Sequence, residues 1–178
     1  MWWKRLPIHL ACERRPNDVS LVKLLIDSFP DSLRMKDENG RVPLIHACCS
    51  CASLEIVKLL LSEGPDASFS PDSCNRLALH WACEYDATLE VVCAVLNSYP
   101  DASKHVDEYG RVPLHWECVS LKCSPQIVEN LIQCNPDAIS MKDLDGNTPL
   151  ELMNHSLSVE KDQVIKIFQR CLRNETSG

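Results

Sequence analysis

The densest group of potentially reactive side chains lies at positions 46–51, where the sequence reads His-Ala-Cys-Cys-Ser-Cys. Thiolates together with a histidine are ligands that suit zinc. A second pair of closely spaced cysteines normally completes such a site, and the sequence contains no second C-x-x-C pair. Cys48 also stands at a repeated position that holds Cys12, Cys83 and Cys118 elsewhere. A position filled once in most repeats indicates packing, so we predict no metal site and no cofactor.

His9, His80 and His115 are the other side chains with catalytic potential, because an imidazole can act as a general base. They share one position of a sequence repeat. In a linear stack, each would then face its own neighbouring repeat rather than a common substrate. The sequence contains no G-x-S-x-G or H-E-x-x-H motif. We therefore predict no catalytic residues and a protein that is not an enzyme.

The repeat that positions these residues is marked twice in each unit. The first marker is an Arg or Asn two residues before a helix-opening position, and its steps are 36, 35, 35 and 36 residues. It reads Arg5-Leu6-Pro7, Arg41-Val42-Pro43, Arg76-Leu77-Ala78, Arg111-Val112-Pro113 and Asn147-Thr148-Pro149. The second marker is a Pro-Asp pair that begins at Pro30, Pro65, Pro100 and Pro136.

Each unit is predicted to contain two helices and a turn. Proline fits the first position of a helix, so Pro7, Pro43, Pro113 and Pro149 open a short first helix. The second helices have apolar cores at 21–25, 56–61, 91–96 and 127–132, with a last one at about 159–172. The Pro-Asp pair ends the second helix. A tight turn follows, because positions 40, 75, 110 and 146 hold Gly or Asn, which tolerate positive φ. An aspartate three residues earlier (Asp37, Asp72, Asp107, Asp143) can bond its own turn.

These motifs resemble the ankyrin repeat, which has a period of about 33 residues and a T-P-L-H-x-A signature. The closest matches are Leu6-Pro7-Ile8-His9-Leu10-Ala11, Ile56-Val57-Lys58-Leu59-Leu60-Leu61 and Asp143-Leu144-Asp145-Gly146-Asn147-Thr148-Pro149-Leu150. The resemblance implies an all-α, ankyrin-like helical repeat solenoid of about 4.5 repeats. The predicted units are 1–38, 39–73, 74–108, 109–144 and 145–178.

The sequence departs from the family pattern in three ways. Leu6, Val42, Leu77 and Val112 replace the threonine, so only Thr148 can cap a first helix. Since the units are longer than the family's, we expect irregular hairpin turns. In the last unit Asn154-His155-Ser156 is expected to interrupt the first helix, and residues 174–178 are expected to fray.

Composition and charge exclude several functional classes. The 178 residues carry a net charge of −7 and a pI near 5.3, which argues against a nucleic-acid-binding protein. No apolar run approaches the roughly 18 residues of a membrane span, and no signal peptide is recognisable. The eleven cysteines are an odd number, so we interpret them as reduced thiols and expect the cytoplasm or the nucleus.

The resemblance implies a protein-interaction module whose partner, another protein, binds the concave face and the turn tips. Tyr85 and Tyr109 are the expected anchors of that contact, because aromatic residues often dominate interfaces. The full set of predicted contacts is Glu13, Glu38, Asn39, Ser50, Asp72, Ser73, Glu84, Tyr85, Glu108, Tyr109, Leu144 and Asp145. The turn tips form an acidic row that is either solvated or attracts a basic partner surface. Arg5, Arg41, Arg76 and Arg111 are expected to pair with the turn aspartates and so to blunt that row.

Two other functions remain open. The chain can be a structural subunit that stacks end to end, or a homo-oligomer, through Trp2 and Trp3 or through its last helix. Trp2 and Trp3 can instead cap the first repeat, which we favour. A third possibility is that the chain is a fragment of a longer array. A thiol- or metal-responsive protein would use Cys49, Cys51 and Cys74. Trp81 and Trp116 are predicted to be core residues.

Overall fold

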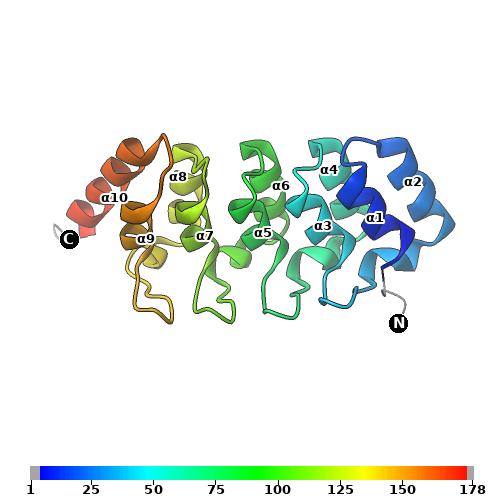
Figure 1. Cartoon of the computed structure of the whole chain (residues 1–178), viewed down its shortest axis with the longest axis horizontal. Coiled ribbons are helices and arrows are strands. Elements are labelled where there is room, and N and C mark those ends of the chain that lie inside the picture. The colour runs from blue at the N-terminus through cyan, green and yellow to red at the C-terminus, as the bar shows by residue number, and fades with distance from the viewer. Residues whose placement is uncertain (1–4, 176–178) are drawn as a thin grey trace.

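The computed structural model describes residues 5–175, which form an elongated stack of helices (Figure 1). Within that range there are ten α-helices and no strands. Each repeat runs from a first helix through a second helix and a short 3₁₀ helix to a projecting turn. The all-helical repeat solenoid predicted from the sequence is confirmed.

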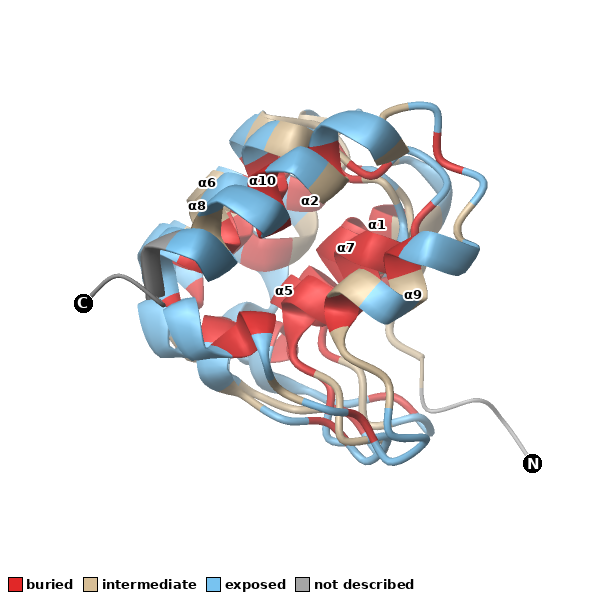
Figure 2. Cartoon of the chain, turned by 90° about the vertical axis from the view of Figure 1, so that its left-hand side faces the viewer, coloured by how far each residue is buried: buried red, intermediate tan, exposed pale blue. Residues whose placement is uncertain are grey.

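The helices form two rows. The first helices are α1 (Pro7–Arg14), α3 (Pro43–Cys49), α5 (Ala78–Glu84), α7 (Pro113–Val119) and α9 (Pro149–His155). The second helices are α2 (Val19–Ser28), α4 (Leu54–Glu63), α6 (Leu89–Ser98), α8 (Pro125–Cys134) and α10 (Lys161–Glu175). Each helix contacts the next helix of its own row and its partner in the same repeat. The end-on view in Figure 2 separates the two rows from the turns, which extend away from both.

The first helices begin as predicted but are capped differently. Pro7, Pro43, Pro113 and Pro149 occupy the first helical position, and Thr148 accepts the hydrogen bond of Glu151 N at 3.3 Å. In three of the four first helices that lack the threonine, a histidine of the helix accepts a hydrogen bond from the preceding backbone instead. Leu6 N donates to His9 Nδ1 at 2.9 Å, and the same bond recurs at His80 and His115.

The proline of each Pro-Asp pair ends the second helix, as predicted, and also opens a 3₁₀ helix that the sequence pattern did not reveal. These are η1 (Pro30–Arg34), η2 (Pro65–Phe69), η3 (Pro100–Lys104) and η4 (Pro136–Ile139). Each packs against its own second helix and against the first helix of the next repeat. The core itself is filled by repeated small and branched residues, such as Ala47, Cys48 and Val57, which are fully buried. Small residues on the first helices let them approach closely.

The turns are regular, so the prediction of irregular hairpins is wrong. In all four, the aspartate N–H donates to the carbonyl four residues later at 2.9–3.0 Å, as in Asp37 N to Arg41 O. Gly40, Asn75, Gly110 and Gly146 have the expected positive φ. Neighbouring turns are also joined by backbone hydrogen bonds, from Ser73 N to Asn39 O and from Leu144 N to Tyr109 O, both at 2.9 Å.

The last repeat is also more regular than expected. Helix α9 has the same seven-residue length as α3, α5 and α7, so residues 154–156 end it rather than interrupt it. Helix α10 runs to Glu175, two residues into the expected frayed tail, and buries Val164, Ile167 and Phe168. Trp2 and Trp3 lie outside the described residues.

Candidate functional site

The turn aspartates are buried and each organises two elements. In Asp72, Oδ1 accepts hydrogen bonds from Cys74 N and Arg76 N at 2.9 Å, which fixes the turn. Its Oδ2 accepts the indole N–H of Trp81 at 2.9 Å, which fixes the turn to α5. Only 2% of the Asp72 side chain is exposed. The prediction that Asp72 lies on an exposed acidic edge is therefore wrong.

The same arrangement recurs in two other repeats. Trp116 donates to Asp107 Oδ2 at 2.8 Å, and His46 donates its Nε2–H to Asp37 Oδ2 at 2.9 Å. Burial alone would raise the pKa of Asp37, but hydrogen bonds from Arg41 N, His46 and Asn39 N outweigh it and lower the pKa. The Asp37 carboxylate therefore stays ionised.

The arginines of the first marker neutralise these carboxylates, as predicted. Each pairs with the aspartate of the following turn, not with its own. The Nε–Oδ2 distances are 3.5 Å for Arg5–Asp37, 4.0 Å for Arg41–Asp72, 3.4 Å for Arg76–Asp107 and 2.9 Å for Arg111–Asp143. A buried carboxylate is tolerated only when it is paired and hydrogen-bonded, so these pairs link successive repeats.

The arginines also stack on the two central tryptophans. The guanidinium of Arg41 lies 4.0 Å from the Trp81 ring centroid. That of Arg76 lies 4.6 Å from Trp81 and 3.5 Å from Trp116, and Arg111 lies 4.9 Å from Trp116. We call Arg41, Trp81, Arg76, Trp116 and Arg111 the Arg–Trp ladder. Cation–π contacts of this kind hold both partners in fixed orientations.

Both predicted aromatic anchors lie against this ladder. Tyr85 follows α5 and its ring centroid is 5.6 Å from that of Trp81, while Tyr109 sits on a turn tip 6.0 Å from Trp116. They are 44% and 46% exposed, whereas Trp81 and Trp116 are buried as predicted. The two tyrosines therefore present aromatic surface to solvent from a rigid base.

The remaining predicted contact residues fall into two groups. Glu38, Asn39, Ser73, Glu108, Leu144 and Asp145 are exposed at the turn tips. Glu13 and Glu84 stand near the ends of first helices, where they pair with Arg5 and Arg76 at 2.8 and 2.7 Å. Ser50 directly follows α3 and is half-buried. Since Asp72 is buried, the second turn contributes no exposed carboxylate to the acidic row.

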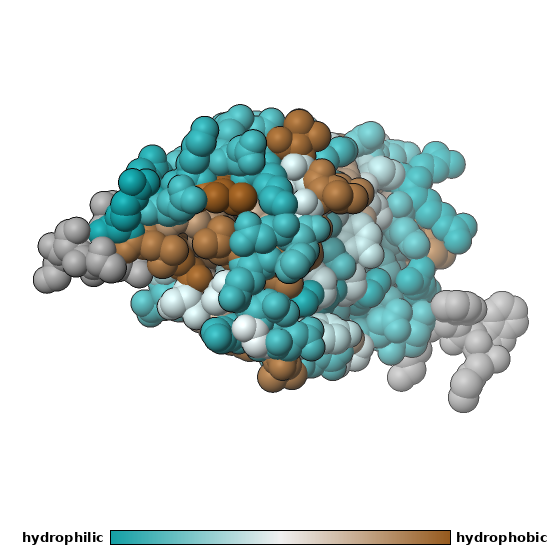
Figure 3. Space-filling model, turned by 60° about the vertical axis from the view of Figure 1, so that its left-hand side comes forward, coloured by the Kyte–Doolittle hydropathy of each residue, from teal (hydrophilic) through white to brown (hydrophobic). Residues whose placement is uncertain are grey.

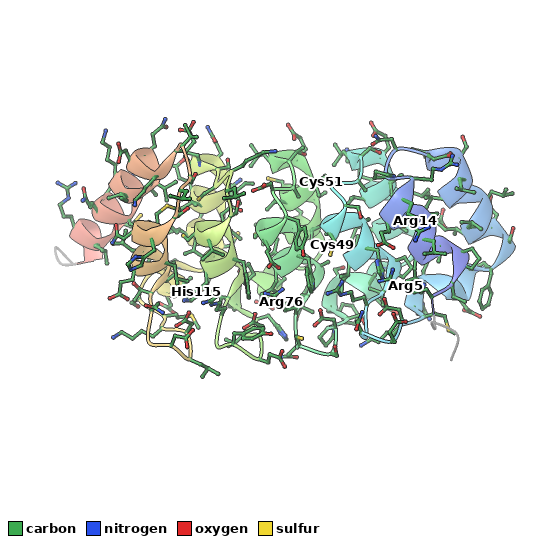
Figure 4. The ribbon with its side chains drawn as sticks, viewed as in Figure 1. Arg5, Arg14, Cys49, Cys51, Arg76 and His115 are labelled. Atoms are coloured by element: carbon green, nitrogen blue, oxygen red, sulfur yellow. The ribbon has the colours of Figure 1, made fainter. Side chains whose placement is uncertain are left out.

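The repeated histidines and most of the cysteines are buried in the core or hydrogen-bonded within the fold. Burial lowers the pKa of His80 to about 4, and its Nε2–H donates to His105 O at 3.1 Å. Cys12 and its equivalents are fully buried, and burial raises the pKa of Cys12 to about 12. Cys51 lies just after α3 (Figure 4). It is exposed, and its thiol donates to Tyr85 O at 3.0 Å. Across residues 5–175 no three His, Cys, Asp or Glu residues come together in a way that could hold a metal ion.

Glu117 was not singled out from the sequence. It takes the place on α7 that Ala11, Ala47 and Ala82 hold on the other first helices, and it is almost completely buried. Burial raises the pKa of its carboxyl to about 8, although Ser124 N donates to Glu117 Oε1 at 2.7 Å. The bond ties α7 to the start of α8. A charged residue at an alanine position is the signal that could have identified it.

The face of the molecule shown in Figure 3 is mostly hydrophilic, and apolar residues form separate patches on it. In the part of the chain that the structure describes, no helix is long and apolar enough to cross a membrane.

Comparison with known proteins agrees with this architecture. The family model for ankyrin repeats, which contains three copies, matches residues 8–106, from α1 through η3. No curated protein matches the chain. The helices after residue 106 continue the same order of elements.

Proposed function

The chain belongs to the ankyrin-repeat family, and from this premise we propose that it is a non-catalytic adaptor that binds another protein on its concave face. Ankyrin repeats generally mediate protein–protein interaction. The binding surface consists of the turn tips and the exposed sides of the first helices around the Arg–Trp ladder.

One observation carries this proposal: Tyr85 and Tyr109 are half-exposed and both pack on buried tryptophans. An aromatic side chain that is already held in place loses little conformational entropy when a partner covers it. Such residues contribute strongly to protein interfaces. The ladder supplies the rigidity, because Trp81 and Trp116 are each fixed by an aspartate and two arginines.

The turn tips add charge to this surface. Glu38, Glu108 and Asp145 are exposed carboxylates on three of the four turns. We propose that they attract a basic region of the partner and speed its association. The eleven free thiols support a reducing compartment, the cytoplasm or the nucleus.

A quantitative pull-down from native lysate tests the proposal. The variant Tyr85→Ala/Tyr109→Ala should lose the prey that the wild-type chain captures. The control is Phe69→Ala, which removes a similarly exposed aromatic residue at the end of η2. Loss of the same prey from both variants, or from neither, would refute binding at the tyrosines.

Assembly of several copies through the ends is the second candidate. Its support is an apolar surface at the first repeat, where Leu24 and Phe29 of the α2 region are 62% and 46% exposed. Light scattering over a range of concentrations decides it, because a mass that stays at one chain excludes homo-assembly.

A further inference from the structure

Arg41 lacks an ion pair that the arginines before and after it possess. Arg5 Nη1 binds Glu13 at 2.8 Å and Arg76 Nη1 binds Glu84 at 2.7 Å. In both repeats the glutamate stands eight residues after the arginine, near the end of the first helix. The eighth residue after Arg41 is Cys49. Figure 4 places Cys49 on α3, between the regions of Arg5 and Arg76.

Nothing else among the described residues takes the place of that glutamate. The only ionic partner of Arg41 there is Asp72, 4.0 Å from Nε, and this carboxylate is already occupied by two backbone N–H groups and Trp81. No hydrogen bond links the Arg41 guanidinium to residues 5–173, and its buried Nε atom has no hydrogen-bond partner. Arg111, which has Val119 at the equivalent position, is compensated by Asp143 at 2.9 Å and Asp145 at 3.9 Å.

Arg41 is nevertheless held in place and reachable. Its guanidinium lies 4.0 Å from the Trp81 ring centroid, so its orientation is fixed. A quarter of its side chain is exposed, the largest fraction among the four arginines of this series. Tyr85 packs on the same tryptophan and is also exposed. Burial raises the pKa of Cys49 to about 12, so this neighbour is an uncharged thiol and adds no negative charge.

We propose that Arg41 is the binding position for an aspartate or glutamate side chain of the protein partner. The partner's carboxylate takes the place that Glu13 and Glu84 hold in the adjacent repeats, and the residues beside it pack on Tyr85. This inference rests on the proposed adaptor function and specifies it. The partner's acidic side chain meets the first-helix face at Arg41. Any basic region of the partner meets the turn tips instead.

A random dodecapeptide library, fused to phage through the peptide C-termini, provides the probe. Because no free C-terminal carboxylate is displayed, an acidic consensus can come only from side chains. Panning against the full wild-type chain should enrich one Asp or Glu position. The selected peptide is then synthesised with Glu or Gln at that position, and its affinity is measured by fluorescence anisotropy.

Two substitutions in the chain test the position directly. Arg41→Gln should weaken the Glu peptide by about tenfold or more, the usual effect of losing a charge-assisted hydrogen bond, and should leave the Gln peptide unchanged. Cys49→Glu should weaken the Glu peptide similarly, because the new carboxylate would pair with Arg41 as Glu84 pairs with Arg76. Cys49→Gln is the control, because glutamine has nearly the same size as glutamate but no charge. This variant should bind the Glu peptide as tightly as wild type.

The outcomes separate this inference from the adaptor function on which it rests. A selection that enriches no acidic position, or no peptide at all, overturns the carboxylate site, as does equal binding by Cys49→Glu and Cys49→Gln. If Tyr85→Ala abolishes binding of the peptide but the Arg41 and Cys49 variants leave its affinity unchanged, the concave face binds the peptide and the Arg41 site is wrong. If none of these variants alters the binding, both proposals fail.

Discussion

Replacing Glu117 by glutamine should change how the stability of the chain depends on pH. The carboxyl has a pKa of about 8 in the native chain, because burial disfavours the charged form, against an ordinary value of 4.5. Between these two values the native state keeps a proton that the unfolded chain releases. The free energy of unfolding therefore falls as pH rises through this interval, and is highest, for this group, below pH 4.5.

The size of the effect follows from the two pKa values. Each pH unit between them removes about 1.4 kcal/mol, so the wild-type chain loses about 5 kcal/mol by pH 8 through this group alone. Glutamine has the same shape, stays neutral and can accept the hydrogen bond of Ser124 N, which binds Glu117 at 2.7 Å. Glu117→Gln should thus match wild type near pH 5 and exceed it by several kcal/mol at pH 8.

Urea unfolding followed by tryptophan fluorescence at pH 5.5, 6.5, 7.5 and 8.5 measures this difference. Taking the difference between variant and wild type removes the contributions of the buried histidines, which both chains share. Glu55→Gln on α4, where the side chain is exposed, is the control and should leave the pH profile unchanged. A Glu117→Gln profile parallel to wild type would refute the assignment of a buried, protonated carboxyl.

Three further predictions concern the turns and the first helices. Gly40→Ala should cost at least about 1 kcal/mol more than Gly146→Ala in urea unfolding: both residues have positive φ, but only at position 40 would the new Cβ meet a neighbour, Ser73 N at 2.7 Å. Asp72→Asn should lower the free energy of unfolding by about 1–3 kcal/mol, because Asp72 uses one oxygen for Cys74 N and Arg76 N and the other for Trp81, and an amide has only one acceptor oxygen. Asp66→Asn, at an exposed ion pair, should change the free energy of unfolding by less than about 0.5 kcal/mol in the same assay. Burial lowers the pKa of His80 to about 4, so the neutral His80 stabilises the chain above pH 6.5 and this stabilisation is lost as the pH falls toward 4. In thermal melts over that pH range, the melting temperature of His80→Gln should therefore fall less than that of wild type.

The order of elements was predictable because each boundary depends on one residue type at a fixed spacing. Proline at the start of the first helices and in the Pro-Asp pairs set most helix ends, and Gly or Asn set the turns. The regularity of the turns was not predictable from the lengthened units. It depends on hydrogen bonds between successive turns, such as Ser73 N to Asn39 O, and these form only once the repeats are stacked.

The candidate site was predictable in its exposed aromatic residues but not in its buried polar ones. Tyr85 and Tyr109 are accessible as expected, while Asp72 was placed on the surface because its contacts come from another element. A signal was nevertheless present. Asp37 and His46, Asp72 and Trp81, and Asp107 and Trp116 are each separated by nine residues, and each pair joins a carboxylate to a ring N–H.

The regular pairs also indicate where specificity can arise. A contact that recurs in three repeats, such as Trp81 with Asp72, joins one repeat to the next and cannot be released for a partner without loss of stability. Binding specificity must therefore come from positions where the repeats differ. Cys49 is such a position, because a glutamate there would complete a pair seen on both sides of it. The missing glutamate leaves Arg41 with its orientation fixed and its charge only partly neutralised, which is the arrangement that an acidic side chain of a partner would recognise.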